Sequence, residues 1–174
     1  ITEKMRDKSK KGTLLWVLDK TATSMGGRHL RRWLNDPLID TKEINRRLNA
    51  VKELKDNIIL RGDVIDNLKK VYDIERLAGK MAYGNANARD MITLKNSLSK
   101  LPDVKQVLSS CTSEMLKELY ENLDELKDIY ELIEKSIVED PPMTVKEGGI
   151  IKLGYDEEID KLNEKYSNIE ILLG

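Results

Sequence analysis

The sequence predicts an all-α protein: an irregular multi-helix bundle with long lever-type helices and at most one short extended segment. Apolar residues recur at spacings of three and four along nearly the whole chain, which is the period of amphipathic helices. Charged residues make up 35% of the 174 residues and the mean hydropathy is −0.50, as expected for helices with extensive polar surface. Capping residues, Gly and Pro stand where the periodic segments stop.

The first well-defined helix is predicted to follow Thr23, a favourable N-cap residue. Gly26 and Trp33 then share its apolar face with Leu30 and Leu34. A glycine inside a helix costs about 1 kcal/mol relative to alanine, so we expect Gly26 to allow close approach of a neighbouring element. We expect Trp33 and Trp16 to be core aromatic residues. Three arginines lie on the opposite face as predicted solvent, interdomain or phosphate contacts: Arg28, Arg31 and Arg32.

The middle of the chain contains three further amphipathic segments. The first opens at Asp40 or Thr41, where Glu43 completes a pattern resembling a capping box. The apolar faces of the three segments are Ile44, Leu48, Val51 and Leu54; then Val64, Ile65, Leu68, Val71 and Tyr72; then Ile74, Leu77, Ala78 and Met81, ending near Gly84.

Two more helices are predicted after these segments. Asn87 and Asp90 are predicted caps of a helix using Met91, Leu94, Leu98 and Leu101, and Pro102 suits the first turn of the next helix.

Two later segments show a strict 3.5-residue apolar repeat, which predicts narrow seams with coiled-coil packing. The first seam is Leu119, Leu123, Leu126, Tyr130, Ile133 and Ile137. The second seam is Tyr155, Ile159, Leu162, Tyr166, Ile169 and Leu173. The first seam packs either on the second or on the bundle. The second is expected to lack its return helix.

The segment between the seams is predicted to be a junction. Pro141 and Pro142 are expected to end the preceding helix, and Gly148–Gly149 to form a turn before a short extended segment at "GIIK". Asp156 is a predicted cap of the last helix, and the acidic residues that follow suit its first turn. That acidic run has no His, no Cys and no calcium-loop spacing, so a metal site is not expected.

Charge is distributed unevenly, although the net charge is only −1. Residues 1–37 carry 9 basic and 4 acidic side chains, whereas residues 112–174 carry 7 basic and 17 acidic ones. The acidic end disfavours a DNA footprint along the whole chain, because phosphate binding requires clustered cations. A phosphate-gripping arm at residues 1–37 stays open as an alternative.

No transmembrane run or signal-peptide core is present in the sequence, and the missing initiator Met suggests a piece of a longer chain. The single cysteine, Cys111, is expected to be a buried thiol in a reducing compartment. There is no phosphate loop, hydrolase elbow or H-E-x-x-H motif, and His29 is the only histidine. We therefore expect no catalytic, cofactor or metal residues, and no enzymatic activity in this chain alone.

Three stretches together carry a family resemblance that covers most of residues 12–162. They are "LLWVLDKTATSMGGRHLRRWLNDPLID", "INRRLNAVKEL" with "VYDIERLAGKMAYGNANARDMITLKNSL", and "EDPPMTVKEGGIIKLGYDEEIDKL". In this order they resemble the core, or lever, domain (domain III) of the MutS family of DNA mismatch-repair proteins. The resemblance implies a basic leader at 1–11, the core domain at 12–154, and the start of a lever helix leading to the clamp at 155–174. Residues 163–174 depart from the family pattern.

The resemblance implies a mechanical role, in which the domain couples ATPase domains to a DNA clamp during mismatch recognition. It implies a longer parent protein, a DNA-dependent ATPase that binds mismatched double-stranded DNA and ATP with Mg. This parent protein is expected to form a homodimer and to recruit MutL, and the present domain to contact its connector, clamp and ATPase domains. The expected location is the bacterial cytoplasm, in association with the nucleoid. A paralogue acting in recombination is the alternative within the family. The residues expected to be structural or relay positions are Gly26, Gly27, Trp33, Pro141, Pro142, Gly148 and Gly149.

Overall fold

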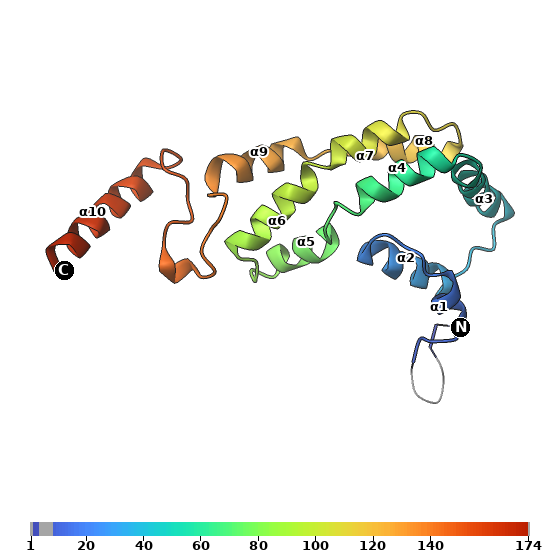
Figure 1. Cartoon of the computed structure of the whole chain (residues 1–174), viewed down its shortest axis with the longest axis horizontal. Helices are drawn as coiled ribbons and strands as arrows, with labels where there is room; N and C mark the ends of the chain where they lie inside the picture. The colour runs from blue at the N-terminus through green and yellow to red at the C-terminus, as the bar shows by residue number, and fades with distance from the viewer. Residues whose placement is uncertain (1, 4–8, 174) are drawn as a thin grey trace. The chain divides into compact units, whose positions relative to one another are not determined.

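The structure is a computed structural model that describes residues 2–3 and 9–173, with side chains described as far as residue 165. Its described residues form α-helices joined mostly by short connections, with a longer one at residues 137–156 between α9 and α10 (Figure 1). In that part of the chain the extended structure is limited to an isolated antiparallel bridge between Ile137 and Ile151. The predictions of an all-α fold and of one short extended segment at "GIIK" are therefore confirmed.

The chain divides into two compact units. Unit 1 comprises residues 1–76 and 99–125, and unit 2 comprises residues 77–98 and 126–174. The helix α5 (Ile74–Ala82) contributes its first three residues to unit 1 and the remainder to unit 2.

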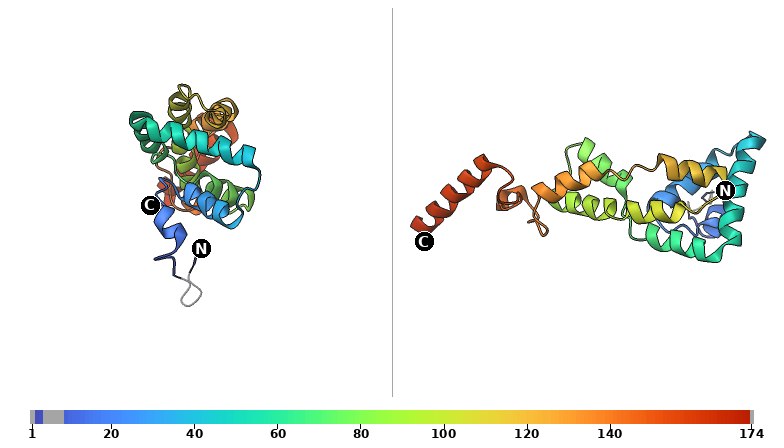
Figure 2. Two further views of the ribbon diagram at one scale, coloured as in Figure 1. Left: turned by 90° about the vertical axis from the view of Figure 1, so that its right-hand side faces the viewer. Right: turned by 90° about the horizontal axis from the view of Figure 1, so that it is seen from above.

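Unit 1 is built from short helices around a small apolar core. Its helices are α1 (Leu14–Leu18), α2 (Ser24–Asn35), α3 (Thr41–Asp56), α4 (Ile58–Leu68), α7 (Leu101–Leu108) and α8 (Glu114–Asn122). The helix α4 lies beside α7, and α3 contacts both α4 and α8 (Figures 1 and 2). The core contains Ala50, Leu60, Cys111 and Leu116. Cys111 is buried, as expected, and this burial raises the pKa of its thiol.

Unit 2 pairs two helices and continues into the last one. Its elements after α5 are α6 (Ala88–Leu98), α9 (Lys127–Ser136), a 3₁₀ turn (Val145–Glu147) and α10 (Glu157–Leu173). The helix α6 packs against α9. The buried apolar residues of unit 2 are Leu77, Ala88, Leu94, Leu98 and Ile133, and Pro141 is also fully buried.

Local capping signals are realised as predicted. Thr23 Oγ1 accepts a hydrogen bond from Gly26 N at 3.0 Å, and Asp40 Oδ1 accepts one from Lys42 N at 2.8 Å. Asn87 and Asp90 exchange reciprocal bonds at the start of α6. Pro102 lies in the first turn of α7, and Asp156 Oδ1 accepts the amides of Glu158 and Ile159 at the start of α10. The exception is Glu43, whose carboxylate pairs with Arg46 at 3.6 Å instead of completing the predicted capping box.

The prediction of one continuous first seam is wrong. The helix α8 ends at Asn122 and α9 begins at Lys127, with Leu126 in the left-handed region at φ 51°. Lys105 of α7 donates to the carbonyl oxygen of Leu123 at 2.8 Å, so a tertiary contact takes up a carbonyl at the end of α8. The two halves of the seam consequently belong to different units.

Several predicted core positions are exposed instead. Trp16 is 52% exposed in α1, so its assignment to the core is wrong. On α3, Leu48 and Val51 are 57% and 58% exposed, because the helix turns the face containing Ala50 and Leu54 toward its neighbours. Tyr155 precedes α10 and lies in a turn, where its amide donates to the carbonyl of Lys152 at 3.2 Å.

The helix before the two prolines also ends earlier than expected. The last residue of α9 is Ser136, and Ile137 already has extended backbone geometry. The chain is held extended there by bonds to residues 150–152, so Pro141 does not end a helix. Within the described residues, none of the helices has the length and apolar character required to cross a bilayer.

Candidate functional site

The first turn of α2 lies tightly against the connection that precedes it. A Cβ atom at Gly26 would lie 3.1 Å from Thr23 Oγ1 and 3.3 Å from Thr21 Cβ, and one at Gly27 would lie 3.3 Å from Thr21 Oγ1. All three distances are shorter than ordinary side-chain contacts, so the two glycines allow this connection to fold back onto the helix. The close neighbour of Gly26 is therefore the preceding connection.

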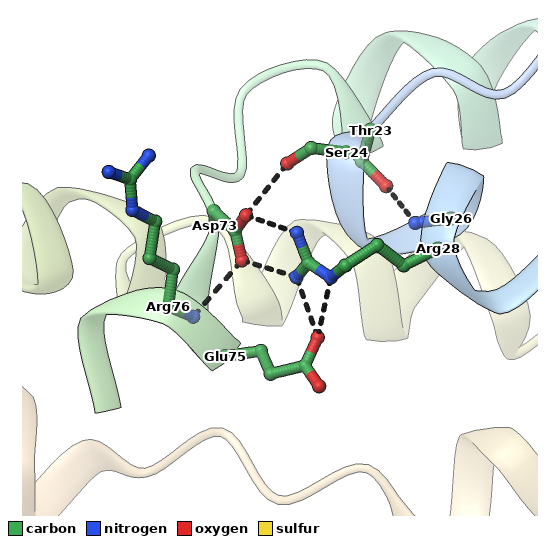
Figure 3. A network of polar contacts seen from close by, with 7 residues as sticks. All are labelled: Thr23, Ser24, Gly26, Arg28, Asp73, Glu75 and Arg76. Carbon is green, nitrogen blue, oxygen red and sulfur yellow. Dashed lines mark hydrogen bonds and ion pairs between the residues drawn. The ribbon is translucent and has the colours of Figure 1, made fainter. Parts of the chain in front are cut away.

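This turn directs Arg28 toward two carboxylates that are distant in sequence (Figure 3). Arg28 Nη1 donates to Asp73 Oδ2 at 2.7 Å and Nη2 donates to Asp73 Oδ1 at 2.8 Å. The same guanidinium donates from Nη2 and Nε to Glu75 Oε2 at 2.6 and 3.1 Å. A planar guanidinium engaged in this way fixes orientation as well as distance.

Asp73 is the hub of the network. Besides Arg28, it accepts a hydrogen bond from Ser24 Oγ at 2.9 Å and one from the amide of Arg76 at 3.1 Å (Figure 3). The second bond satisfies a backbone N–H of the first turn of α5, which is the role of an N-cap. One carboxylate therefore joins the start of α2 to the start of α5. We call Ser24, Arg28, Asp73, Glu75 and Arg76 the Arg28 network.

The charges in this network reinforce one another. The Arg28 guanidinium holds the pKa of Asp73 well below its usual range, with further lowering from Arg76 N and Ser24, and burial opposes these effects. Conversely, hydrogen bonds to Asp73 and Glu75 raise the pKa of Arg28. Only 19% of the Asp73 side chain is exposed, against 44% for Arg28. The ion pairs and hydrogen bonds of the network join the start of α2 to the start of α5, and Arg28 already binds two carboxylates, those of Asp73 and Glu75.

The other residues of α2 that the sequence singled out lie outside this network. Arg31 pairs with Glu3 at 3.4 Å, and Arg32 is exposed in the last turn, where the helix dipole favours a cation. Trp33 is partly buried: the Arg47 guanidinium carbon lies 3.8 Å from its ring centroid, and the His29 ring centroid lies 5.0 Å away.

The proline and glycine positions of the predicted junction belong to unit 2. Pro141 is buried, and its carbonyl accepts a bond from Arg89 Nε at 3.0 Å, while Pro142 is partly buried. Gly148 and Gly149 are exposed with φ of 70° and 65°, values that favour glycine. The predicted relay residues are thus divided between the two units.

A second charged contact that the sequence analysis missed stabilises unit 1. Glu53 of α3 accepts the amides of Thr112 and Ser113 at 2.6 and 2.8 Å and the Thr112 hydroxyl at 3.0 Å. Burial alone would raise the pKa of Glu53, but these hydrogen bonds outweigh it and lower the pKa to about 2. Glu53 thus caps the start of α8 from another helix, where Ser113 makes no side-chain cap bond of its own.

The sequence indicates the helix-capping role of Asp73 but not the ion pair of Asp73 with Arg28. Asp73 stands directly before an amphipathic segment and could have been identified as an N-cap. Its partner Arg28 lies 45 positions away, and no local pattern pairs them. Over the described ranges, no group of three or more His, Cys, Asp or Glu side chains is arranged to hold a metal ion.

A family model and the similar curated proteins point to the same family. The model of MutS domain III matches residues 1–172. The chain is 55% identical to the DNA mismatch repair protein MutS of Clostridium beijerinckii over 164 residues, covering 94% of this chain and 18% of that protein. It is 52% identical to MutS of Clostridium perfringens over 168 residues and 53% identical to MutS of Clostridium tetani over 162, again covering 18% of each.

Proposed function

Because the chain belongs to the MutS domain III family, we propose that it is the core domain that couples the ATPase domains of a mismatch-repair protein to its DNA clamp. The observation that carries the proposal is the Arg28 network. It joins the start of α2 to the start of α5, and α5 is the helix whose residues divide between the two units. A part that transmits movement requires such a fixed connection between its packed helices.

Physical considerations support this role. Packed interiors transmit displacement because their side chains have few voids into which to relax. Coupling between distant sites further requires an element with two arrangements that both sites bias. Asp73 caps α5 and holds Arg28 with the same carboxylate, so a movement of α2 acts directly on the first turn of α5.

The remaining activities belong to the longer protein, since the chain spans 18% of the length of the curated relatives it matches. We propose that this protein binds mismatched double-stranded DNA, and binds and hydrolyses ATP with Mg. We further propose that it is a homodimer, that it recruits MutL and that it acts at the bacterial nucleoid. In this proposal, the domain itself performs no chemistry.

The proposal is tested in a full-length MutS protein carrying this segment with Asp73→Asn. Affinity for a mismatched duplex is measured with and without ATP, together with ATP hydrolysis in the absence of DNA. We expect near-normal basal ATP hydrolysis and a near-normal affinity for the mismatched duplex without nucleotide. Allosteric coupling typically changes an affinity by about 5- to 150-fold, and we expect the change caused by ATP to be several-fold smaller in the variant. The matched control is Asp66→Asn, at an exposed α4 position that pairs across one turn with Lys69. Unchanged coupling in the Asp73 variant would contradict the proposal.

A further inference from the structure

Unit 2 contains a buried ammonium group. Lys95 of α6 has a side chain only 6% exposed, and its Nζ lies 2.7 Å from Glu134 Oε2 of α9. A lysine is rarely this buried unless it is paired. Glu139 lies farther away, with Oε1 at 3.8 Å from the same Nζ. Glu134 is therefore the principal counter-ion of Lys95.

Glu134 contacts a second ammonium group with its other atoms. Lys152 Nζ donates to the backbone carbonyl oxygen of Glu134 at 2.5 Å and lies 3.4 Å from Glu134 Oε1. The three side chains come from α6, α9 and the extended segment before α10. The Lys95 and Lys152 ammonium groups lower the pKa of Glu134, and Glu134 in turn raises the pKa of Lys95, so Lys95 and Glu134 face each other as a charged pair at neutral pH.

Backbone bonds fasten the same extended segment. Val138 N donates to Ile150 O at 3.0 Å, and Lys152 N donates to Ser136 O at 2.8 Å. These two bonds flank the bridge of Ile137 with Ile151. Lys152 is thus held at its side chain and at its backbone, both times by the C-terminal part of α9 and the residues that follow it.

From Lys152 the connection to α10 is short and bonded throughout. The amide of Tyr155 donates to the Lys152 carbonyl at 3.2 Å. Gly154 has φ 83°, and its amide donates to Asp160 Oδ2 in the first turn of α10 at 2.9 Å. These bonds tie the first turn of α10, which Asp156 caps, to the backbone next to Lys152.

We propose that Lys95 and Glu134 are positioning residues: the buried Lys95 ammonium holds the Glu134 carboxylate, which holds Lys152 and thereby fixes the base of α10. We call the three side chains the Lys95–Glu134–Lys152 clasp. The inference rests on the proposed function only in that α10 is the lever helix. The clasp gives that helix a defined base on the α6–α9 pair, with α6 and α9 as its support.

The test uses the 174-residue chain, with hydrogen exchange of individual amides and thermal unfolding measured in parallel. In Glu134→Gln, the amides of Lys152 and Gly154 should exchange about tenfold faster, as expected when a bond to a charged group is lost and local opening becomes easier. In Lys152→Met they should also accelerate, and Lys152→Arg should restore slow exchange. Glu131→Gln, one turn earlier on α9, is the matched control and should leave both amides unchanged.

A double variant separates positioning from simple charge compensation. Glu134→Gln alone leaves the buried Lys95 ammonium without its principal counter-ion, which itself destabilises the unit. Adding Lys95→Met removes that charge, so thermal stability should recover while the Lys152 amide still exchanges rapidly. Slow exchange at Lys152 in the double variant, or in Glu134→Gln, would overturn the inference. Failure of the relay function would appear separately, as unchanged coupling of ATP to mismatch affinity in the full-length protein.

Discussion

Replacing Glu53 with Gln should destabilise unit 1 by a predictable amount. Glu53 Oε1 accepts the Thr112 amide and hydroxyl, and Oε2 accepts the Ser113 amide. Gln keeps one acceptor but places an NH₂ group against a donor. Loss of a helix cap costs about 0.5–2 kcal/mol, and a hydrogen bond to a charged group contributes about 1.5–3 kcal/mol. Because Glu53 is partly exposed and one acceptor survives, we expect a loss of about 1–2 kcal/mol.

The contribution of Glu53 should depend on pH in a defined direction. Its pKa is lowered from 4.5 to about 2 on folding, so the unfolded chain binds the proton first as the pH falls. The stabilisation is therefore complete above pH 4.5 and is lost progressively as the pH falls toward about 2. The Gln variant has no such group, so the difference between the two proteins should shrink over this window.

Urea unfolding of both proteins at pH 7 and at several values down to pH 3 provides the assay. The midpoint should fall in Glu53→Gln at pH 7 with little change in the denaturant slope, because the same surface is exposed on unfolding. Glu121→Gln, at an exposed position of α8, should be nearly neutral. Equal midpoints for Glu53→Gln and the parent at pH 7, or a difference that does not vary with pH, would refute the assignment of Glu53 as the cap of α8.

Three other outcomes are expected. Gly26→Leu should destabilise the chain by about 1–3 kcal/mol through overpacking against the preceding connection. Gly62→Leu is the control, because a Cβ at Gly62 meets nothing within 4 Å, and it should cost less in the same urea titration. Equal unfolding midpoints for the two variants would contradict the close approach at Gly26. The isolated chain should show no saturable ATP binding by calorimetry at micromolar concentrations, and a well-defined isotherm would contradict this. Substituting Arg28, Arg31 and Arg32 with Ala should change DNA retention little at physiological salt, and residual binding should weaken with salt without selecting mismatches; a tight mismatch-selective complex lost in the triple variant would mean that this chain reads DNA itself.

The parts of the fold that depend on local chemistry were predictable. Thr23, Asp40 and the pair of Asn87 with Asp90 cap helices where the sequence places them, because a cap is formed between residues a few positions apart. The turn predicted at Gly148–Gly149 is also formed, and both residues adopt the positive φ that glycine tolerates. Such signals do not depend on the rest of the molecule.

The parts that depend on distant contacts were not predictable. A strict repeat across Leu123 and Leu126 suggested one helix, but Lys105 takes the Leu123 carbonyl and Leu126 adopts a left-handed conformation. The partners of Arg28 and Glu53 lie 45 to 60 positions away, so periodicity carried no information about them. The apolar character of Leu48 likewise did not reveal which face of α3 is buried.

The most direct test of the relay is a double-mutant cycle on the effect of ATP on mismatch affinity. Arg28→Met, Asp73→Asn and the double variant are compared in the full-length protein. If the Arg28 network transmits the movement, each single variant should reduce the coupling, and the double variant should reduce it no further, because both changes break one connection. Wild-type coupling in all three proteins, or losses that simply add, would contradict the account.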